Sequence, residues 1–315
     1  MDKAIDFVSD SYDICFENKK YKRIKGVNIS SGIDTSVTFI GSGISVLKND
    51  LLNDNIPKNG EFITQKAIRT QNLKNIYDLD VDSRYYSFFE ALSVLRNYDD
   101  LDLLFDDMIS FFNNYLNIDK NDILLRANFS DSDLVNIIEK RDIKCEYNTE
   151  DLNLYKHKYG LDDLEIYGRN LNIALRNINT NIYDDVGNLI IIESPKKKYG
   201  CEFAIGIQPI LMATQGKKYS LECSYISELL PLKTIVERKF AEAFVVVANL
   251  LNENIEDNNH RYPKYLYKKY LKALNYYLNE MKIDEEFIRK TMLEYLEKEY
   301  KGENIKRLNL KLEGK

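Results

Sequence analysis

The residues best suited to chemistry lie between positions 62 and 92, in the stretch FITQKAIRTQNLKNIYDLDVDSRYYSFFEAL. Its β-forming residues predict two strands, 62–70 and 83–92, joined by a long polar loop. Arg69 lies near the end of the first strand. On the second strand, period-2 alternation places four residues on one face: Arg84, Tyr86, Phe88 and Glu90.

An arginine, an aromatic ring and a carboxylate on one pleated surface can hold a nucleotide. The guanidinium binds a phosphate through two parallel hydrogen bonds, the ring stacks on the base, and the carboxylate accepts from an amino group. The alternative is a half-buried hairpin with an aromatic core face and solvated charges. Composition alone favours this alternative, because aromatic residues are ordinary in strands.

The composition excludes several classes of protein. With 315 residues, 44% of them hydrophobic, the chain has room for a large domain and a smaller one, or for two of ordinary size. The formal net charge of −6 does not attract nucleic acid in bulk, although a local basic patch is compatible with it. There is no apolar run of about 18 residues and no hydrophobic signal segment, so we expect a cytoplasmic protein without a membrane span.

Metal and histidine-based chemistry have few candidate residues. The four cysteines are widely spread and include no CxxC pair, and the chain has only two histidines, His157 and His260. We therefore expect no metal site built from protein ligands and no histidine-based nucleophilic triad. The cysteines are expected to be reduced core residues.

The remaining segments predict an α+β fold. Apolar spacing predicts helices over 1–25, 44–52, 99–116 and 130–141, and one that begins over 209–213. Strands are predicted over 36–40, 123–128, 188–193 and 202–207, with a turn at 41–43. Residues 144–180 give no clear pattern. From about residue 229 the sequence is helical throughout, so we predict an α+β domain over 1–225 and a helical domain over 226–315.

One helical segment in the C-terminal part carries a basic face. Lys264, Lys268, Lys269 and Lys272 lie largely off its apolar stripe, beside several tyrosines. Such a face can bind RNA phosphates, or it can simply be solvated, and the sequence leaves both interpretations open.

Several blocks also match the motifs of a known family, and they follow one another in that family's order. Residues 34–48 resemble its first motif, with Thr35 where a proline is usual and these residues in place: Asp34, Phe39, Gly43 and Lys48. Residues 64–92 resemble the second motif, with these residues in place: Gln65, Arg69, Arg84, Phe88, Phe89 and Glu90.

Two later blocks continue the series. Residues 188–193 (NLIIIE) are similar to a conserved strand of the family, with Asn188 kept and Gly187 where a tryptophan is usual. Residues 202–209 (EFAIGIQP) correspond to the third motif. With these blocks in order, the chain resembles the catalytic core of class II aminoacyl-tRNA synthetases, and among them that of the alanyl enzymes.

The resemblance implies an antiparallel sheet, flanked by helices, that binds ATP, Mg²⁺ and an amino acid and forms an aminoacyl adenylate. Arg69 would be the catalytic residue, holding the α-phosphate and the substrate carboxylate. The implied ATP-binding residues are Arg69, Arg84, Phe88, Phe89 and Glu90, with either Phe88 or Phe89 stacked on adenine. The implied amino-acid-binding residues are Asn188, Glu202 and Gly206, with Glu202 where the family has the aspartate that pairs with the ammonium group.

The departures from the family matter as much. Pro209 replaces the third-motif arginine that contacts the ATP phosphates, and proline offers neither charge nor a backbone donor. The editing domain of the full synthetase has no counterpart here.

Two hypotheses about function follow. In the first, the chain is a truncated ligase that passes an activated amino acid to a tRNA or to another acceptor such as a carrier protein. In the second, it is a paralogue without catalysis that senses an amino acid, binds RNA or supports a partner.

Overall fold

A nine-stranded sheet runs through the computed structural model, which describes residues 2–158, 165–257 and 261–302. The strand order is β1-β2-β3-β9-β8-β7-β4-β5, and β6 pairs with β7 off this path. All pairs are antiparallel except β1 with β2 and β4 with β5. The strands are β1 (Lys22–Arg23), β2 (Glu61–Ile68), β3 (Phe88–Asn97), β4 (Ile123–Asn128), β5 (Cys145–Asn148), β6 (Lys156–Lys158), β7 (Tyr167–Arg176), β8 (Tyr183–Ser194) and β9 (Lys197–Gly206).

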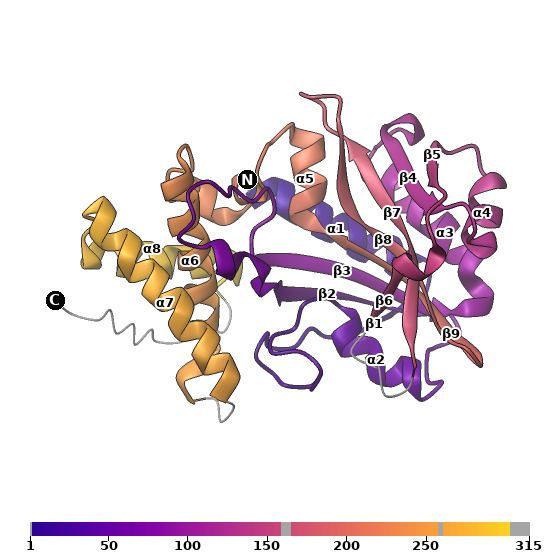
Figure 1. Cartoon of the computed structure of the whole chain (residues 1–315), viewed down its shortest axis with the longest axis horizontal. Coiled ribbons are helices and arrows are strands. Elements are labelled where there is room, and N and C mark those ends of the chain that lie inside the picture. The colour runs from indigo at the N-terminus through magenta and orange to yellow at the C-terminus, as the bar shows by residue number, and fades with distance from the viewer. Residues whose placement is uncertain (1, 159–164, 258–260, 303–315) are drawn as a thin grey trace.

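Helices cover the two faces of the sheet differently (Figure 1). On the back face, α1 (Asp2–Asn18), α3 (Leu101–Ser110) and α5 (Ile207–Gln215) pack with the sheet into the large apolar core. The apolar stripe predicted for α1 is buried there, from Ile5 to Phe16. On the front face, α2 (Ile44–Leu52) packs on Ile63, Leu95 and Ile190 in a smaller cluster. The short α4 (Ser132–Glu139) starts at Asp131, whose side chain caps it.

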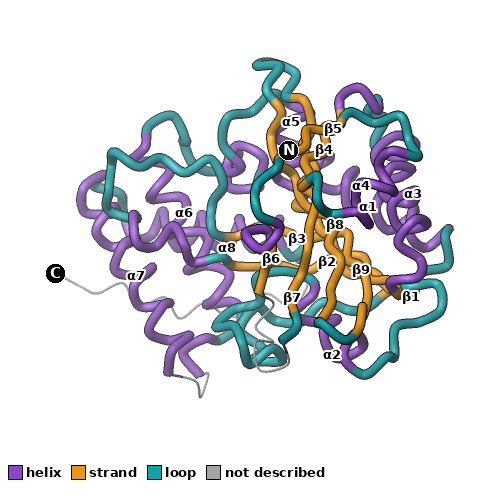
Figure 2. The backbone as a smooth tube through the Cα atoms, turned by 45° about the vertical axis from the view of Figure 1, so that its right-hand side comes forward, coloured by secondary structure: helices purple, strands orange, loops and turns teal. Residues whose placement is uncertain are grey.

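The C-terminal part is helical, as predicted. It consists of α6 (Ile235–Asn252), α7 (Arg261–Met281) and α8 (Glu285–Glu299), which lie together at one end of the molecule (Figures 1 and 2). Thr234 and Glu237 form a capping box at the start of α6. The predicted fold class, an antiparallel sheet flanked by helices with a helical C-terminal part, is confirmed. The domain boundary at 225/226 stays a prediction, since one apolar core extends from α1 to α8.

Long-range contacts decide where β3 begins. The predicted strand over 83–92 is wrong in its first half, because β3 starts at Phe88. The backbone before it bonds to distant loops: Ser220 N donates to Arg84 O at 2.8 Å, and Tyr86 N donates to Ser220 Oγ at 3.0 Å. Ser87 N donates to a carboxylate oxygen of Glu242 at 3.1 Å. Arg84 and Tyr86 therefore do not share a strand face with Phe88 and Glu90.

Two further predictions fail for local reasons. Residues 36–40 form turns instead of a strand, because the Asp34 carboxylate accepts from both Ser36 N and Ser36 Oγ and closes a turn there. The strand β7 lies in the region that gave no clear pattern. Its residues alternate in burial: Leu171, Ile173 and Leu175 are buried on the back face, while Asn170 and Asn172 are on the front.

The front face of the sheet is crossed by residues 26–43, which we call the strap. The Glu253 carboxylate, just past the end of α6, accepts from Ile29 N at 2.6 Å and from Ser30 N at 2.8 Å. Gln65 bonds both polar backbone groups of Val27, at 2.9 Å each. The strap is thus fastened to the helical part at one point and to β2 at another.

Candidate functional site

A cavity of about 700 Å³ opens on the front face of the sheet. Its floor comes from β3, β9, β8 and β7, and its walls from α2, the strap, the end of β2 and the start of α5. A pocket of this size that joins apolar surface with a few convergent polar groups is typical of small-molecule sites.

The cavity brings together five of the predicted site residues, from four separate segments of the chain. Arg69 follows the end of β2, Phe89 is the second residue of β3, and Asn188 lies on β8. Glu202 and Gly206 both lie on β9. Their common cavity depends on strand pairing between residues more than 100 positions apart in sequence.

The cavity lining does not include Phe88, Glu90 or Arg84, so the predicted placement of these three residues is corrected. Phe88 and Glu90 point to the back face of β3, where Phe88 is fully buried in the core. Glu90 pairs there with Lys66 at 3.3 Å. Neighbouring residues of a strand point to opposite faces, so of the two phenylalanines only Phe89 faces the cavity.

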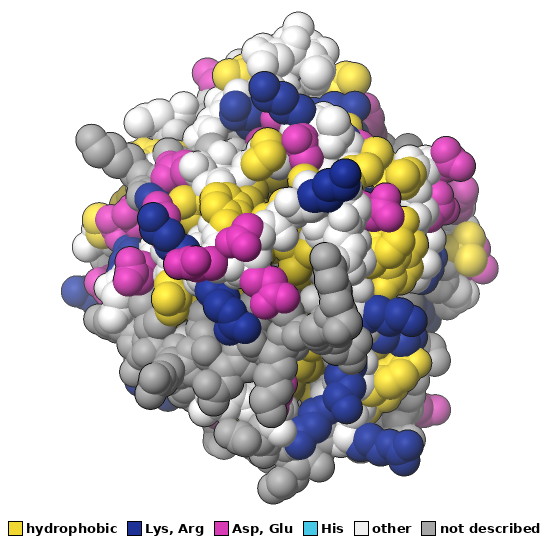
Figure 3. All heavy atoms as spheres, turned by 90° about the vertical axis from the view of Figure 1, so that its left-hand side faces the viewer, with side chains coloured by type: hydrophobic (Ala, Val, Ile, Leu, Met, Phe, Trp, Pro, Cys, Tyr) yellow, Lys and Arg dark blue, Asp and Glu magenta, His cyan; other side chains and the backbone are white. Residues whose placement is uncertain are grey.

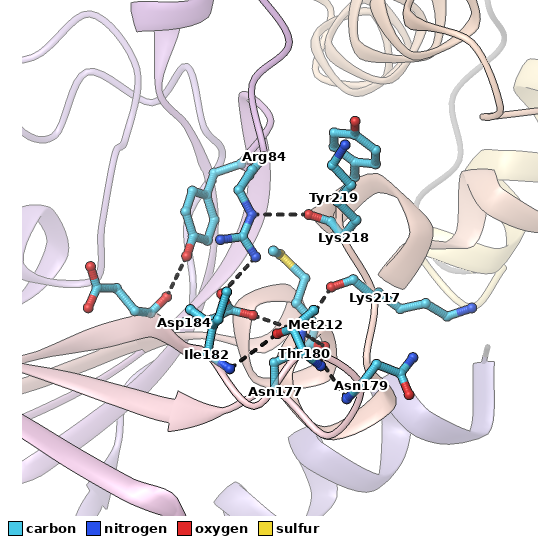
Figure 4. Close-up of polar contacts among 12 residues, drawn as sticks. Arg84, Asn177, Asn179, Thr180, Ile182, Asp184, Met212, Lys217, Lys218 and Tyr219 are labelled. Atoms are coloured by element: carbon cyan, nitrogen blue, oxygen red, sulfur yellow. Dashed lines mark hydrogen bonds and ion pairs between the residues drawn. The ribbon is translucent and has the colours of Figure 1, made fainter.

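Arg84 instead bonds to one strand and one loop. Its Nη2 donates to Asp184 Oδ1 at 2.7 Å and its Nε to Lys218 O at 3.3 Å (Figure 4). Asp184 is buried and also accepts from Asn177 Nδ2 at 2.9 Å. Arg84 therefore fastens the segment before β3 to β8 and to the chain that follows α5.

Arg69 lies against the wall of the cavity. Its Nε donates to Gly41 O in the strap at 3.1 Å, and its guanidinium carbon lies 5.0 Å from the centre of the Phe89 ring. A guanidinium over an aromatic face is a favourable cation–π arrangement. Arg69 is exposed and Phe89 half-buried, so a positive charge and an aromatic surface lie next to each other at the cavity wall.

The floor is organised in rows across the strands. In one row, Ser93 on β3 pairs with Ala204 on β9, Ala204 pairs with Asn188 on β8, and Asn188 pairs with Asn172 on β7. In the next row, Glu202 lies between Leu95 and Ile190. Glu202 is 1% exposed, so its carboxylate stands in an environment of low polarity.

Three amides are linked at the β8–β7 side of the floor. The Nδ2 of Asn170 donates to Asn172 Oδ1 at 2.6 Å and to Asn188 Oδ1 at 3.0 Å. This arrangement occupies the carbonyl oxygens of the two amides that line the cavity. Their NH₂ groups are then the parts available to a ligand.

An ion pair joins α2 to the strap at the cavity edge. Lys48 Nζ donates to Asp34 Oδ2 at 2.6 Å and to Ser36 Oγ at 3.1 Å. Burial alone would raise the pKa of Asp34, but the bonds from Lys48 and Ser36 outweigh it and hold that pKa below its usual value. Asp34 therefore stays ionised at neutral pH and keeps the lysine in place.

The start of α5 closes the cavity on another side. Gly206 precedes this helix, and a Cβ at that position would lie 2.9 Å from Pro209 Cδ. Gln208 Oε1 accepts from Glu90 N at 3.1 Å. Pro209 lies in the first turn of α5, where the missing N–H costs the helix nothing, and it brings no charge to the cavity.

Gly187 shows why the family's tryptophan has no counterpart here. A Cβ at this position would lie 2.1 Å from Ala204 O, so the backbones of β8 and β9 leave no room for a side chain. The residue lies beside an irregularity in the pairing of β8 with β7. A tryptophan side chain therefore has no room at this position.

The structure adds lining residues that the sequence did not identify as site residues. They are Lys48, Tyr85, Ser93, Asn172 and Asp185. For Asn172 a signal existed, because NLNIALR alternates polar and apolar residues as a half-buried strand does. Tyr85 comes from an irregular segment, and Asp185 lies on β8 beside an irregularity in its pairing with β7, so periodicity marks neither residue.

Comparison with known proteins gives three findings. No family model matches the chain. A segment of 78 residues is 35% identical to the alanine–tRNA ligase of Mycoplasmopsis agalactiae, covering 24% of this chain and 8% of that protein. The chain is thus similar to a small part of the curated relative that it matches.

Solved structures of similar arrangement are synthetases too. S. aureus histidyl-tRNA synthetase in its apo form has 12% sequence identity and a TM-score of 0.46, covering 85% of this chain and 84% of that chain. Pyrrolysyl-tRNA synthetase from Desulfitobacterium hafniense has 6% identity and a TM-score of 0.43, covering 70% and 73%. The chain resembles class II aminoacyl-tRNA synthetases.

Two negative findings concern the described residues, 2–158, 165–257 and 261–302. No helix among them is long and apolar enough to cross a membrane. No three His, Cys, Asp or Glu side chains among them gather into a candidate metal site. His260 lies outside these residues, and the side chain of His157 is not described.

Proposed function

We propose that the cavity binds ATP together with an amino acid and joins them into an aminoacyl adenylate. The observation that carries this proposal is the convergence of Arg69, Phe89, Asn188, Glu202 and Gly206 on one cavity. These residues come from three sequence blocks that resemble the second motif, the conserved strand and the third motif of the synthetases. The 78-residue match to alanine–tRNA ligase is consistent with it.

Arg69 and Phe89 would form the nucleotide side of the site. The ring offers its face to the adenine, since base–aromatic stacking suits any purine. The guanidinium beside it would bind the α-phosphate in a bidentate way. Because the charge on phosphorus and its oxygens rises in the transition state, a fixed cation there stabilises it more than the ground state.

Glu202 and Asn188 would form the amino acid side. The buried Glu202 carboxylate attracts the ammonium group, and Asn188 lies one row away on β8. A carboxylate oxygen of the amino acid attacks the α-phosphorus and forms the new P–O bond. The bond from that phosphorus to the bridging oxygen breaks, and pyrophosphate leaves with its electron pair. Such a site works by positioning and charge neutralisation.

The lining fits Mg²⁺ that arrives with a nucleotide. Mg²⁺ is usually held by one or two carboxylates together with substrate phosphates. Of the three carboxylates in the described lining, Asp34 is bound to Lys48 and Glu202 is assigned to the ammonium group, so Asp185, whose Oδ1 bonds Arg126, is the one that would hold the ion. Bound there, the ion would neutralise charge on the phosphates. Of the two cations in the described lining, Lys48 is bound to Asp34, so Arg69 would be the chain's main contribution to this neutralisation, while Pro209 supplies no charge.

Amino-acid-dependent exchange of pyrophosphate into ATP tests the proposal directly. We expect exchange with at least one amino acid in a panel of the standard residues and common non-standard ones, and none without amino acid. Absence of exchange with every member, together with absence of ATP binding by calorimetry, would contradict it. The acceptor of the activated amino acid, a tRNA or another acceptor such as a carrier protein, would then be sought by transfer assays with the active amino acid.

A second function, binding without catalysis, is favoured by Pro209 and by the exposed face of α7. Tyr262 and Tyr265 stack there with ring centres 5.9 Å apart, and Lys269 Nζ lies 4.6 Å from the centre of the Tyr265 ring. Figure 3 faces the end of the molecule that holds the C-terminal helices and shows basic side chains beside hydrophobic ones. Aromatic rings beside lysines suit single-stranded RNA. This function predicts RNA binding that Lys269→Glu weakens and an in vivo role that survives Arg69→Ala.

A further inference from the structure

The floor of the cavity carries polar groups beyond those that bind a backbone ammonium and carboxylate. Asn188 and Asn172 face each other across β8 and β7, and both line the cavity. Asn170 holds their carbonyl oxygens, so each directs its NH₂ donors elsewhere. Both amides are half-buried, and amide donors in such a place are stabilised when a ligand accepts from them.

A hydroxyl lies at the other end of the same row. Ser93 Oγ is fully buried, lines the cavity and has no hydrogen-bond partner among the described residues. Ala204, which stands between Ser93 and Asn188, has only a methyl side chain, and Gly43 of the strap lies over Ser93, where a Cβ would come 2.4 Å from Ser93 Oγ. The row therefore carries a covered hydroxyl, a methyl group and two amides in sequence.

The charges around this row disfavour an acidic ligand group. Arg126 on β4 is the next residue in the row, paired with Asn172. Its guanidinium is already bound by Glu146 at 3.0 Å and by Asp185 at 2.7 Å. Glu202 lies in the adjacent row, and the proposed function requires its carboxylate to be ionised. A second carboxylate placed here would be repelled by that charge, and the cation of this row, Arg126, is already paired.

We infer that the amino acid taken by this cavity has a neutral side chain with an oxygen acceptor, that is, an amide or a hydroxyl. The inference rests on the proposed function and narrows its substrate class. Asn172 and Asn188 donate to the side-chain oxygen. An alkyl side chain of the same size leaves these donors unsatisfied, and a site built to bond a polar group rejects such an analogue strongly.

The test compares isosteric amino acids in the pyrophosphate exchange assay. The sets are asparagine with aspartate and leucine, glutamine with glutamate, and threonine with valine. For at least one set we expect kcat/KM for the amide or hydroxyl member to exceed that of its isosteres by tenfold or more. Equal or better use of the alkyl or acidic members in every set would overturn the inference and leave the proposed function standing.

Variants test whether this row of residues causes the preference for a neutral amino acid side chain. Asn172→Asp keeps the size of the side chain and removes its donors, so the preference for the neutral member should fall about tenfold. Asn279→Asp, the same change at an exposed position of α7, should leave the preference unchanged. A preference that Asn172→Asp does not alter would contradict the assignment to this row, provided that its melting temperature matches that of the control.

Direct binding separates the two proposals. The probes are the aminoacyl sulfamoyl adenosines of the same sets, measured by calorimetry without turnover. Tight binding of the amide or hydroxyl probe without any exchange would support the inference while the proposed catalysis fails. Tight binding of the alkyl or acidic probe alone would overturn the inference, and binding of none would overturn both.

Discussion

The two faces of β3 make opposite use of their polar groups. On the back face, Glu90 lies in a buried cluster with Lys66 and Glu299, where Lys66 Nζ bonds both carboxylates and lies 4.9 Å from the centre of the Tyr300 ring. On the front face, Ser93 lines the cavity and its hydroxyl has no protein partner among the described residues. A polar group that bonds to another protein group stabilises the fold, whereas a polar group without a protein partner can bind a ligand.

This contrast predicts that back-face substitutions change stability and front-face substitutions change activity. The largest effect on stability is expected at Lys66. Lys66→Met leaves Glu90 and Glu299 without their cation, and loss of one partner of a buried ion pair costs about 3–5 kcal/mol. Burial raises the pKa of Glu299 to about 7, so part of this cost is relieved by its protonation below neutral pH.

Urea unfolding at pH 8 measures this cost. Lys197→Met is the control, because Lys197 pairs with Asp54 on the exposed surface and such pairs contribute less than about 1 kcal/mol. Equal midpoints for the two variants would contradict the distinction between the faces.

The next expected effect is a loss of activity without a loss of stability. Arg69→Ala removes the cation proposed for the α-phosphate, so exchange activity should fall about 10²–10³-fold while the unfolding midpoint stays near that of the wild type. Arg289→Ala, at an exposed site on α8, should change neither quantity. Activity that survives Arg69→Ala would favour the binding function over catalysis.

Glu61 is an exception to this contrast, because it lies on the front face of the sheet but affects stability. Burial first, and then the charge of Asp50, raise its pKa to about 7. A carboxyl with a raised pKa binds its proton more tightly when folded, so stability should fall as pH rises from about 4.5 to about 7.

The glutamine variant isolates that contribution. Glu61→Gln should be about 3 kcal/mol more stable than the wild type at pH 8 and should lose this advantage near pH 4.5. Thermal melts across this range measure the difference. A difference in melting temperature that stays constant at all pH values would mean that packing, not protonation, distinguishes the variant from the wild type.

The smallest effect on activity is expected at Phe89. Phe89→Ala removes the ring proposed for adenine, which should raise KM for ATP about tenfold with little loss of stability. The adjacent Phe88→Ala should act in reverse, with an unchanged KM in the folded fraction and a loss of about 3–5 kcal/mol of stability. A raised KM in Phe88→Ala would show that the base stacks on the other side of the strand.

The sequence predicted those parts of the structure that depend on local pattern. The bounds of α2 and β4 match the predictions, because helical and strand periodicity are complete within those segments. The start of β3 could not be predicted, since Ser220 and Glu242 hold residues 84–87 from more than 130 positions away. Residues 36–40 have strand composition, yet a single carboxylate, Asp34, turns the chain there.

For the candidate site, resemblance to motifs found residues that periodicity could not. Arg69 and Glu202 lie in different blocks, and only the family's order of motifs suggested that they share a site. The same resemblance misplaced Glu90, because a motif records identity and spacing but not the face of a strand. Asn172 was missed for the opposite reason: it lies in a strand that resembles no motif and that only its alternation marks.

The carboxylate of Glu253 has a consequence for any shortened form of the protein. Every residue that lines the cavity lies at or before Ser220, so a fragment that ends ahead of α6 would retain the complete lining. It would nevertheless lose the acceptor that fixes the backbone of Ile29 and Ser30. Such a fragment would also lose the part of the apolar core that α6, α7 and α8 supply, so it cannot be taken as an intact cavity even though every lining residue is present.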